Sequence, residues 1–88
     1  MNDTPQPMLH SLAYICRQRR RERQHTQATI AERAGVSRSA VNEFEATRTW
    51  PRDPDRLVRG YADDERDAAQ LWQRAVQHHT ETIEGTNA

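Results

Sequence analysis

The stretch QATIAERAGVSRSAVNEFE, residues 27–45, contains two short helical patterns joined by a glycine. In its first half, Ile30, Ala31 and Ala34 fall at helical spacing and form one narrow apolar face. Gly35 predicts the end of this helix, because glycine adopts the left-handed conformation of a helix C-terminus without strain. The stretch is therefore expected to begin with a short helix followed by a tight turn.

The second half of this stretch predicts a helix whose two sides differ. Ser37 is a suitable N-cap, and Ala40, Val41 and Phe44 then lie together on one side. The opposite side carries polar and charged residues, namely Arg38, Ser39, Asn42 and Glu43. A helix with only a structural role would usually carry Ala, Leu, Glu and Lys there. We therefore expect this polar side to contact a partner. Two short helices joined by a tight turn form a helix-turn-helix, the second helix of which enters the major groove of DNA.

The rest of the chain is also predicted to be helical. Apolar residues at helical spacing predict a helix from residue 8 to about residue 23, and another over residues 64–79. Between them, Asp53 is a suitable cap for a helix with Pro54 at its first position. We find no strand pattern and no internal repeat. The expected fold is all-α, a compact bundle of four to five helices that contains the helix-turn-helix.

The domain organisation follows from the same pattern. Residues 1–8 contain two prolines among polar residues and are expected to form a flexible arm. A helix-turn-helix domain is expected over residues 9–62, an additional C-terminal helix over 63–79, and a disordered tail over 80–88.

Composition restricts the function classes. The chain has 88 residues, enough for one small helical domain, and its single cysteine, Cys16, fits a reducing cytosol. It has neither an apolar run of membrane-spanning length nor the pattern of a secretory signal. We expect no enzyme activity and no cofactor, because a phosphate loop needs a Lys that this sequence lacks, and no catalytic set of residues can be placed. His10, Cys16, His78 and His79 lack the spacing of a zinc site, so no metal is expected.

Charge is distributed unevenly along the chain, although the net charge is zero. Residues 1–52 carry nine Arg against five Asp or Glu, whereas residues 53–88 carry four Arg against eight acidic residues. All of the basic residues other than histidine are arginines, which make bidentate contacts with phosphate. The basic first half therefore favours a nucleic-acid partner.

The segment TQATIAERAGVSRSAVNEFE, followed by WP and RLVRGYA, resembles the phage repressor and Cro-type (XRE-like) helix-turn-helix family. The resemblance covers about residues 9–62 and depends on the turn glycine, the small Ala31 and the anchors Ile30, Val36, Val41 and Phe44. It implies a lambda-repressor-like fold and a sequence-specific regulator that binds double-stranded DNA at a promoter. Such a regulator is expected in the cytoplasm of a bacterial host, associated with the nucleoid.

The resemblance also implies roles for individual residues. Ser37, Arg38, Ser39, Asn42 and Glu43 would face the major groove. Arg38 suits guanine and Asn42 suits adenine. Glu43 either accepts a hydrogen bond from cytosine or stays solvated and discourages wrong contacts, and both readings remain open.

Further roles implied by the resemblance concern the DNA backbone. Gln27 would bind a phosphate and support the reading helix. Arg20 would pair with Glu45, which ties three helices together and holds Arg20 near the phosphates. Arg48 and Arg52, in the loop after the reading helix, would contact phosphates as well.

Three positions depart from the family pattern. Ala46-Thr47 stands where an Asn-Gly-like turn usually follows the Glu, and Gln24-His25 stands where Gly-Leu usually precedes the first motif helix. Arg19 occupies a position where many relatives have a leucine. These departures affect the expected geometry of the loops more than they affect the expected fold.

Two questions remain open at the level of sequence. The apolar stripe of the last helix, Ala68, Leu71, Trp72, Ala75 and Val76, either packs on its own core or forms a dimer. We expect a homodimer with contacts through Leu71, Trp72 and Ala75, because four helices already close the minimal core of the family. The alternative to DNA binding is a protein-binding helix-turn-helix module, an antitoxin or adaptor that docks another regulator through its acidic C-terminal half.

Overall fold

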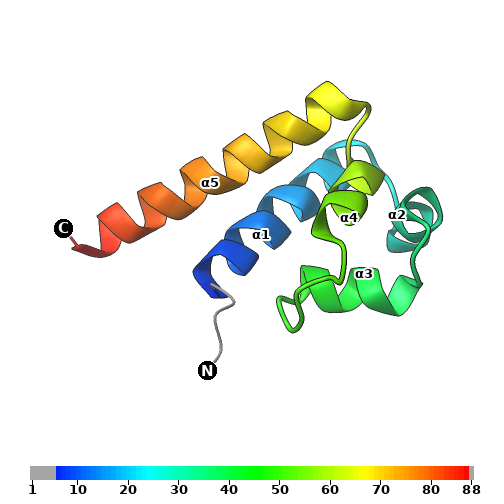
Figure 1. Cartoon of the computed structure of the whole chain (residues 1–88), viewed down its shortest axis with the longest axis horizontal. Helices are drawn as coiled ribbons and strands as arrows, with labels where there is room; N and C mark the ends of the chain where they lie inside the picture. The colour runs from blue at the N-terminus through cyan, green and yellow to red at the C-terminus, as the bar shows by residue number, and fades with distance from the viewer. Residues whose placement is uncertain (1–5, 88) are drawn as a thin grey trace.

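The computed structural model describes the backbone of residues 6–87 and the side chains of residues 8–81. Over this range it contains five helices and no strand: α1 (Gln6–Glu22), α2 (Gln27–Ala34), α3 (Arg38–Glu45), α4 (Pro54–Tyr61) and α5 (Glu65–Asn87). Helices α1 and α5 run antiparallel, and the three short helices are grouped beside the C-terminal half of α1 (Figure 1). The predicted all-α fold with a helix-turn-helix is confirmed.

The predicted caps determine where α2 and α3 begin and end. The Thr26 hydroxyl accepts a hydrogen bond from the Thr29 amide at 3.1 Å, and the Ser37 hydroxyl accepts one from the Ala40 amide at 3.0 Å. Gly35 between them has a φ of 72°, in the left-handed region where other residues are strained. Local chemistry therefore sets the turn that orients α3.

Helices α2 and α4 approach each other closely at Gly60. A Cβ atom at this position would lie 2.8 Å from the Ala34 Cβ and 3.1 Å from the Ile30 carbonyl oxygen. Because the Ile30 carbonyl belongs to the helix backbone, it cannot easily move away. The glycine inside α4 is therefore required by the helix crossing.

The core is formed by apolar residues from all five helices. Its fully buried side chains of largest volume are Tyr61, Phe44, Leu9, Leu12, Ile30, Leu57 and Leu71. Trp50, in the loop after α3, packs against this core and is partly buried.

The prediction of a dimer contact through Leu71, Trp72 and Ala75 needs correction. Leu71 and Ala75 have no exposed surface within the single chain, because α5 packs its apolar stripe against α1. Trp72 is partly buried against the same core, and Val76 is the exposed member of the stripe. Leu71 and Ala75 are therefore covered by their own chain, whereas Val76 and part of Trp72 stay accessible at the surface.

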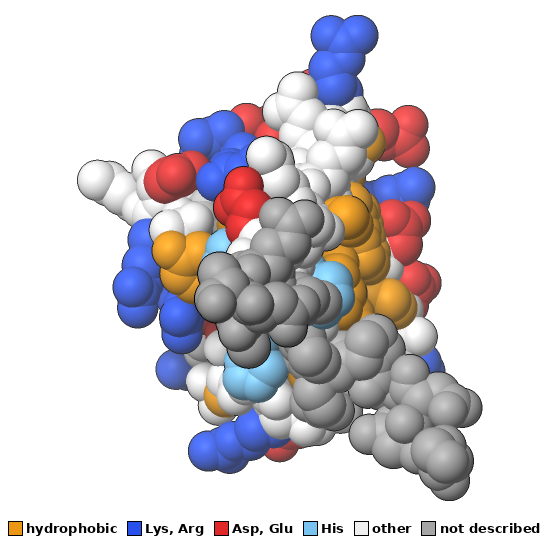
Figure 2. Space-filling view, turned by 90° about the vertical axis from the view of Figure 1, so that its left-hand side faces the viewer, with side chains coloured by type: hydrophobic (Ala, Val, Ile, Leu, Met, Phe, Trp, Pro, Cys, Tyr) orange, Lys and Arg blue, Asp and Glu red, His pale blue; other side chains and the backbone are white. Residues whose placement is uncertain are grey.

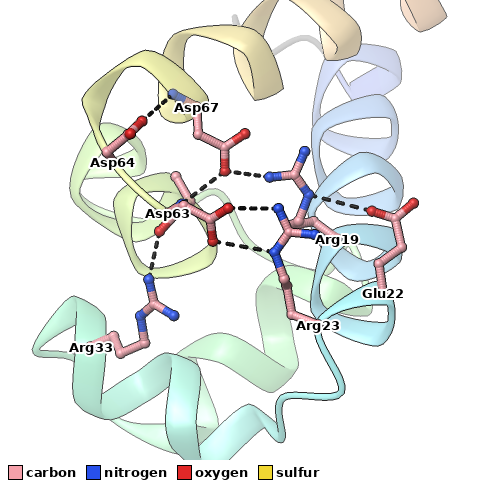
Figure 3. Close-up of polar contacts among 8 residues, drawn as sticks. Arg19, Glu22, Arg23, Arg33, Asp63, Asp64 and Asp67 are labelled. Carbon is pink, nitrogen blue, oxygen red and sulfur yellow. Dashed lines mark hydrogen bonds and ion pairs between the residues drawn. The ribbon is translucent and has the colours of Figure 1, made fainter.

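Arginines at the end of α1 hold the start of α5 in place (Figure 3). The guanidinium of Arg19, which is buried, donates to the carboxylate of Asp67. Arg23 Nη2 lies 2.6 Å from Asp63 Oδ2. Although burial alone would raise the pKa of Asp67, the bond from Arg19 helps to lower it below its usual range. The arginine at the leucine position of the family therefore ties α1 to α5.

The ends of the chain differ from their predicted boundaries. Helix α1 begins at Gln6, and residues 1–5 of the expected arm lie outside the described residues. Helix α5 continues to Asn87, further than the expected end at residue 79, and Ala88 of the expected tail lies outside the described residues.

Candidate nucleic-acid interface

Helix α3 exposes its polar side to solvent and buries its apolar side. Val41 is 0% exposed and Phe44 is 1% exposed, so both anchor the helix in the core. The five residues expected to read bases, Ser37, Arg38, Ser39, Asn42 and Glu43, are all exposed. Arg38, Ser39 and Asn42 line one hollow, Glu43 lines another with the loop after α3, and Ser37 is the N-cap of the helix.

Helix α2 contributes to the same surface at its first turn. Gln27, Arg38, Ser39 and Asn42 line one shallow hollow. A neighbouring hollow is lined by Arg20, His25, Thr26, Gln27, Ala28 and Arg38. Two arginines at the start of a helix suit an anion, because the N-terminal amides and the helix dipole add to their positive charge.

Glu45, the last residue of α3, accepts hydrogen bonds from three other helices. Arg20 of α1 donates through Nε to Oε2 at 2.8 Å and through Nη2 to Oε1 at 2.9 Å. Gln27 of α2 donates to Oε1 at 3.1 Å, and Tyr61 of α4 donates to Oε2 at 2.8 Å. The buried Glu45 carboxylate therefore links α3 to α1, α2 and α4.

The charge state of this cluster follows from its partners. Burial alone would raise the pKa of Glu45, but the hydrogen bonds from Arg20, Gln27 and Tyr61 bring that pKa below its usual value. Burial raises the pKa of Tyr61 far above its usual value, with Glu45 adding to the effect. The phenol thus stays protonated and acts as a donor, while Glu45 stays charged at neutral pH.

Arg20 and Gln27 serve this cluster and also reach the surface. Arg20 uses Nη1 to donate to the His25 carbonyl at 3.1 Å, which fixes the guanidinium from a second side. Its side chain is 16% exposed, and it lines the hollow beside Arg38. Gln27 is half-buried and lines both hollows. Both residues are placed to face an anion while supporting α3.

The loop after α3 carries the two remaining arginines expected to contact phosphates. Arg48 and Arg52 are exposed. The Thr49 hydroxyl donates to Glu43 Oε1 at 3.3 Å, and the Arg48 amide donates to the Glu43 carbonyl at 3.0 Å. Glu43 thus holds the loop against α3, which is a role that neither of its two sequence-based readings included.

Two loop residues adopt left-handed backbone conformations. Gln24 has a φ of 58° and Thr47 has a φ of 57°. These are the positions where the family pattern noted above has glycine. The loops therefore keep the backbone geometry that the pattern requires, although this chain lacks the glycines.

Two partners in these networks were not predicted. No role was predicted from the sequence for either Tyr61 or Asp67. Tyr61 could have been recognised, because a buried tyrosine hydroxyl normally finds a hydrogen-bond partner. Asp67 lies 48 residues from Arg19 in sequence and carries no local signal for the pairing.

Other kinds of site find little support in the described residues. Within residues 8–81, no three His, Cys, Asp or Glu side chains come together in a group that could hold a metal ion. Cys16 is fully buried, and burial raises the pKa of its thiol far above the usual range. No described helix combines the length and the apolar character needed to cross a membrane.

Comparisons with known proteins point to the same segment. No curated protein and no solved structure matches the chain significantly. A family model does match: residues 17–54, which run from the C-terminal half of α1 to the start of α4, match the model described as Helix-turn-helix. This match agrees with the helix-turn-helix that α2 and α3 form in this segment.

Proposed function

We propose that this protein is a sequence-specific regulator of transcription, of the phage or prophage repressor or Cro type, that binds double-stranded DNA. Helix α3 enters the major groove. The observation that carries this proposal is the outward-facing polar side of α3, anchored from behind by the buried Val41 and Phe44. A regulator of this type would act in the cytoplasm of a bacterial host, associated with the nucleoid.

Base recognition is assigned to the exposed side of α3. Arg38 binds guanine through its two terminal nitrogens, and Asn42 binds adenine. Ser37 and Ser39 stand beside Arg38 and make shorter contacts. The Glu43 carboxylate accepts a hydrogen bond from Thr49, which holds it beside the bases in the major groove. There its negative charge disfavours bases that present hydrogen-bond acceptors.

Phosphate contacts are assigned to the surfaces on either side of α3. Arg20 and Gln27 bind one phosphate at the start of α2, where both line the same hollow. Arg48 and Arg52 bind phosphates through the loop after α3, where both are exposed.

The alternative, a module that docks proteins through its acidic half, is less favoured by the observed ion pairs. Asp63 and Asp67 bind Arg23 and Arg19 of the same chain, and Asp55 lies 3.4 Å from Arg59. Much of the acidic charge in the second half of the sequence is therefore neutralised internally. On the polar side of α3, by contrast, Arg38, Ser39 and Asn42 form no side-chain hydrogen bond or ion pair within residues 8–81.

Selection of bound sites from a random duplex pool, followed by anisotropy titration at several salt concentrations, tests the proposal. We expect a defined site, affinity that falls steeply with salt, and a loss of about 1–3 kcal/mol for Arg38→Ala with relaxed preference at one base pair. Arg66→Gln, which removes an exposed arginine of α5, is the matched control. A wild type that enriches no site and binds no duplex would refute the function.

A further inference from the structure

A third hollow lies beyond the C-terminal end of α3 and outside the residues assigned above. Helix α1 lines it with His10, Tyr14 and Arg17, the loop after α3 with Thr47, and α5 with His78. Three separate parts of the chain therefore meet at one surface site.

The chemistry of this hollow suits an oxyanion. Arg17 carries a positive charge, the two histidines bring ring nitrogens, and Tyr14 and Thr47 bring hydroxyl groups. The acidic residue among its lining is Glu45, whose carboxylate oxygens already accept hydrogen bonds from Arg20, Gln27 and Tyr61. The lining thus offers donors and positive charge without a free carboxylate to repel an anion.

Parts of the hollow are held rigidly. The His78 ring stacks on the Tyr14 ring with centroids 4.8 Å apart, and its Nδ1 lies 2.9 Å from the hydroxyl oxygen of the buried Ser11. The Tyr14 hydroxyl in turn accepts a hydrogen bond from Gln18 at 2.9 Å. A ligand that enters the hollow meets a histidine that is already oriented.

Arg17 differs from Arg19 and Arg20 of α1 and from Arg23, which follows the helix, whereas the exposed Arg21 likewise has no ion-pair partner among residues 8–81. Arg19, Arg20 and Arg23 each form an ion pair with an acidic residue. Arg17 forms no hydrogen bond or ion pair with a side chain among residues 8–81, although it is half-buried. An arginine left with its donors unused beside two histidines is the principal candidate to hold an anion.

The position of the hollow identifies the source of the anion. The N-terminal half of α1 and the loop after α3 lie on the same side of the molecule as α3 (Figure 1). Figure 2 views the molecule from the end at which α1 begins and shows arginine and histidine side chains on this face. Arg48, already assigned to the DNA backbone, directly follows the lining residue Thr47.

The hollow of Arg17 is linked to the hollow beside Arg38 through the Glu45 cluster. Glu45 lines the hollow of Arg17, and Arg20, which lines the hollow beside Arg38, donates two hydrogen bonds to the Glu45 carboxylate. The hollow of Arg17 therefore lies next to the phosphate site assigned to Arg20.

We propose that this hollow binds a backbone phosphate of the DNA, with Arg17 as its main ligand and with His78 and His10 beside it. The proposal rests on the proposed function, because it needs α3 to be docked on duplex DNA. The same chemistry would accept free phosphate, so the test must separate the two sources.

The test compares Arg17→Gln with Arg66→Gln in the full chain, using anisotropy titrations of a selected duplex and an unrelated duplex. We expect Arg17→Gln to weaken binding to both duplexes by roughly 3- to 10-fold at 0.1 M salt. It should also make the slope of log K against log salt less steep by about 0.9. Arg66→Gln should leave the slope unchanged, and Arg17→Lys should restore part of it, because Lys keeps the charge. Circular dichroism should show that all variants are folded, since Arg17 forms no side-chain hydrogen bond or ion pair among residues 8–81.

Three outcomes would overturn the inference, and they are distinguishable. If the wild type binds DNA and Arg17→Gln matches Arg66→Gln, the hollow is not a phosphate contact, while the proposed function stands. If the wild type binds no duplex, the proposed function fails as well. If inorganic phosphate at millimolar concentration shifts the NMR signals of Tyr14 and His78 in an Arg17-dependent way without DNA binding, the hollow belongs to a free anion.

Discussion

The Tyr61 hydroxyl lies 2.8 Å from Oε2 of Glu45 and donates a hydrogen bond to it in the core. Tyr61 is 1% exposed and Glu45 is 5% exposed, so neither group can turn to water instead. Through this bond α4 is attached to Glu45, the last residue of α3. Arg20 donates to the same Glu45 carboxylate. By holding this carboxylate in place, the Tyr61 hydroxyl also helps to orient Arg20.

Removal of this hydroxyl should be costly. We expect Tyr61→Phe to lower the free energy of unfolding by about 1–3 kcal/mol, because a buried carboxylate loses a donor that water cannot replace. Urea denaturation at pH 7 measures the change. Tyr14→Phe is the matched control: Tyr14 is 39% exposed, and its loss of a hydroxyl should change stability by less than about 0.5 kcal/mol. Equal effects of the two substitutions would show that the Tyr61 bond contributes nothing of its own.

Arg20 and Glu45 should be energetically coupled. Arg20→Met alone leaves a buried carboxylate without its cation, and Glu45→Leu alone leaves a half-buried guanidinium without its anion. The double variant removes both charges, so we expect it to cost less than the sum of the two single variants. Urea denaturation of the four proteins in a double-mutant cycle measures the coupling. Additive losses would mean that the pair acts as two independent surface charges.

The central helices were predictable because their signals are local. Thr26, Ser37 and Asp53 each cap a helix that begins at the next residue, and Gly35 takes the left-handed conformation that the turn needs. Such caps depend on bonds between residues only three positions apart. The exposed side of α3 was predictable for the same reason, since helical spacing alone separates it from Val41 and Phe44.

The parts that sequence could not decide depend on distant contacts. The apolar stripe that contains Leu71 has the same sequence pattern whether α1 or a second chain covers it. Arg19 is polar in sequence, and only the approach of Asp67 from α5 makes its burial acceptable. The anion hollow beside Arg17 also needs α1, α5 and the loop after α3 to be brought together.

Acid should weaken the fold through Glu45. Because the pKa of Glu45 is lowered in the folded state, its contribution to stability is present above its unfolded pKa and is lost as pH falls through the folded value. The pKa values of Asp63 and Asp67 are lowered as well, so they contribute in the same acidic range. We expect the urea concentration at the midpoint of unfolding to decrease once the pH is lowered below about 4, where unperturbed carboxyl groups become protonated.

Glu45→Gln isolates the part of this dependence that belongs to Glu45. The variant should be less stable than the wild type at pH 7 and should lose less stability between pH 7 and pH 3. The residual slope should come from the aspartates, so it should shrink further when Asp67→Asn is added. A variant with the full acid dependence of the wild type would place the pH effect elsewhere.

Glycine should stabilise both left-handed loop positions. A non-glycine residue in the left-handed conformation is strained by roughly 1–2 kcal/mol, and glycine removes this strain. Glycine also makes the unfolded chain more flexible, which offsets about 0.5–1 kcal/mol of that gain. We therefore expect Gln24→Gly and Thr47→Gly each to raise the free energy of unfolding by about 0.5–1 kcal/mol. The gain should be larger for Thr47, because its branched Cβ is more strained there.

Thermal and urea denaturation measure these gains, with Thr49→Gly as the control. Thr49 does not have a positive φ, so glycine there should destabilise the protein. Destabilisation by Thr47→Gly would show that the Thr47 hydroxyl bond to the Ala46 carbonyl outweighs the backbone strain.

The packing of α5 predicts a chain that folds without a partner. Leu71 and Ala75 are fully buried against α1, and Arg19 and Arg23 attach the start of the helix by ion pairs. We therefore expect sedimentation at micromolar concentration to give a monomer in the absence of DNA. Trp72→Asp should lower stability by roughly 2–4 kcal/mol, because a charge is placed against the core, and it should leave the sedimentation coefficient of the folded fraction unchanged. Val76→Asp is the control, since Val76 is 51% exposed and should tolerate the charge. A dimeric wild type that Trp72→Asp converts into a folded monomer would show that a second copy, and not α1, is the main partner of this helix.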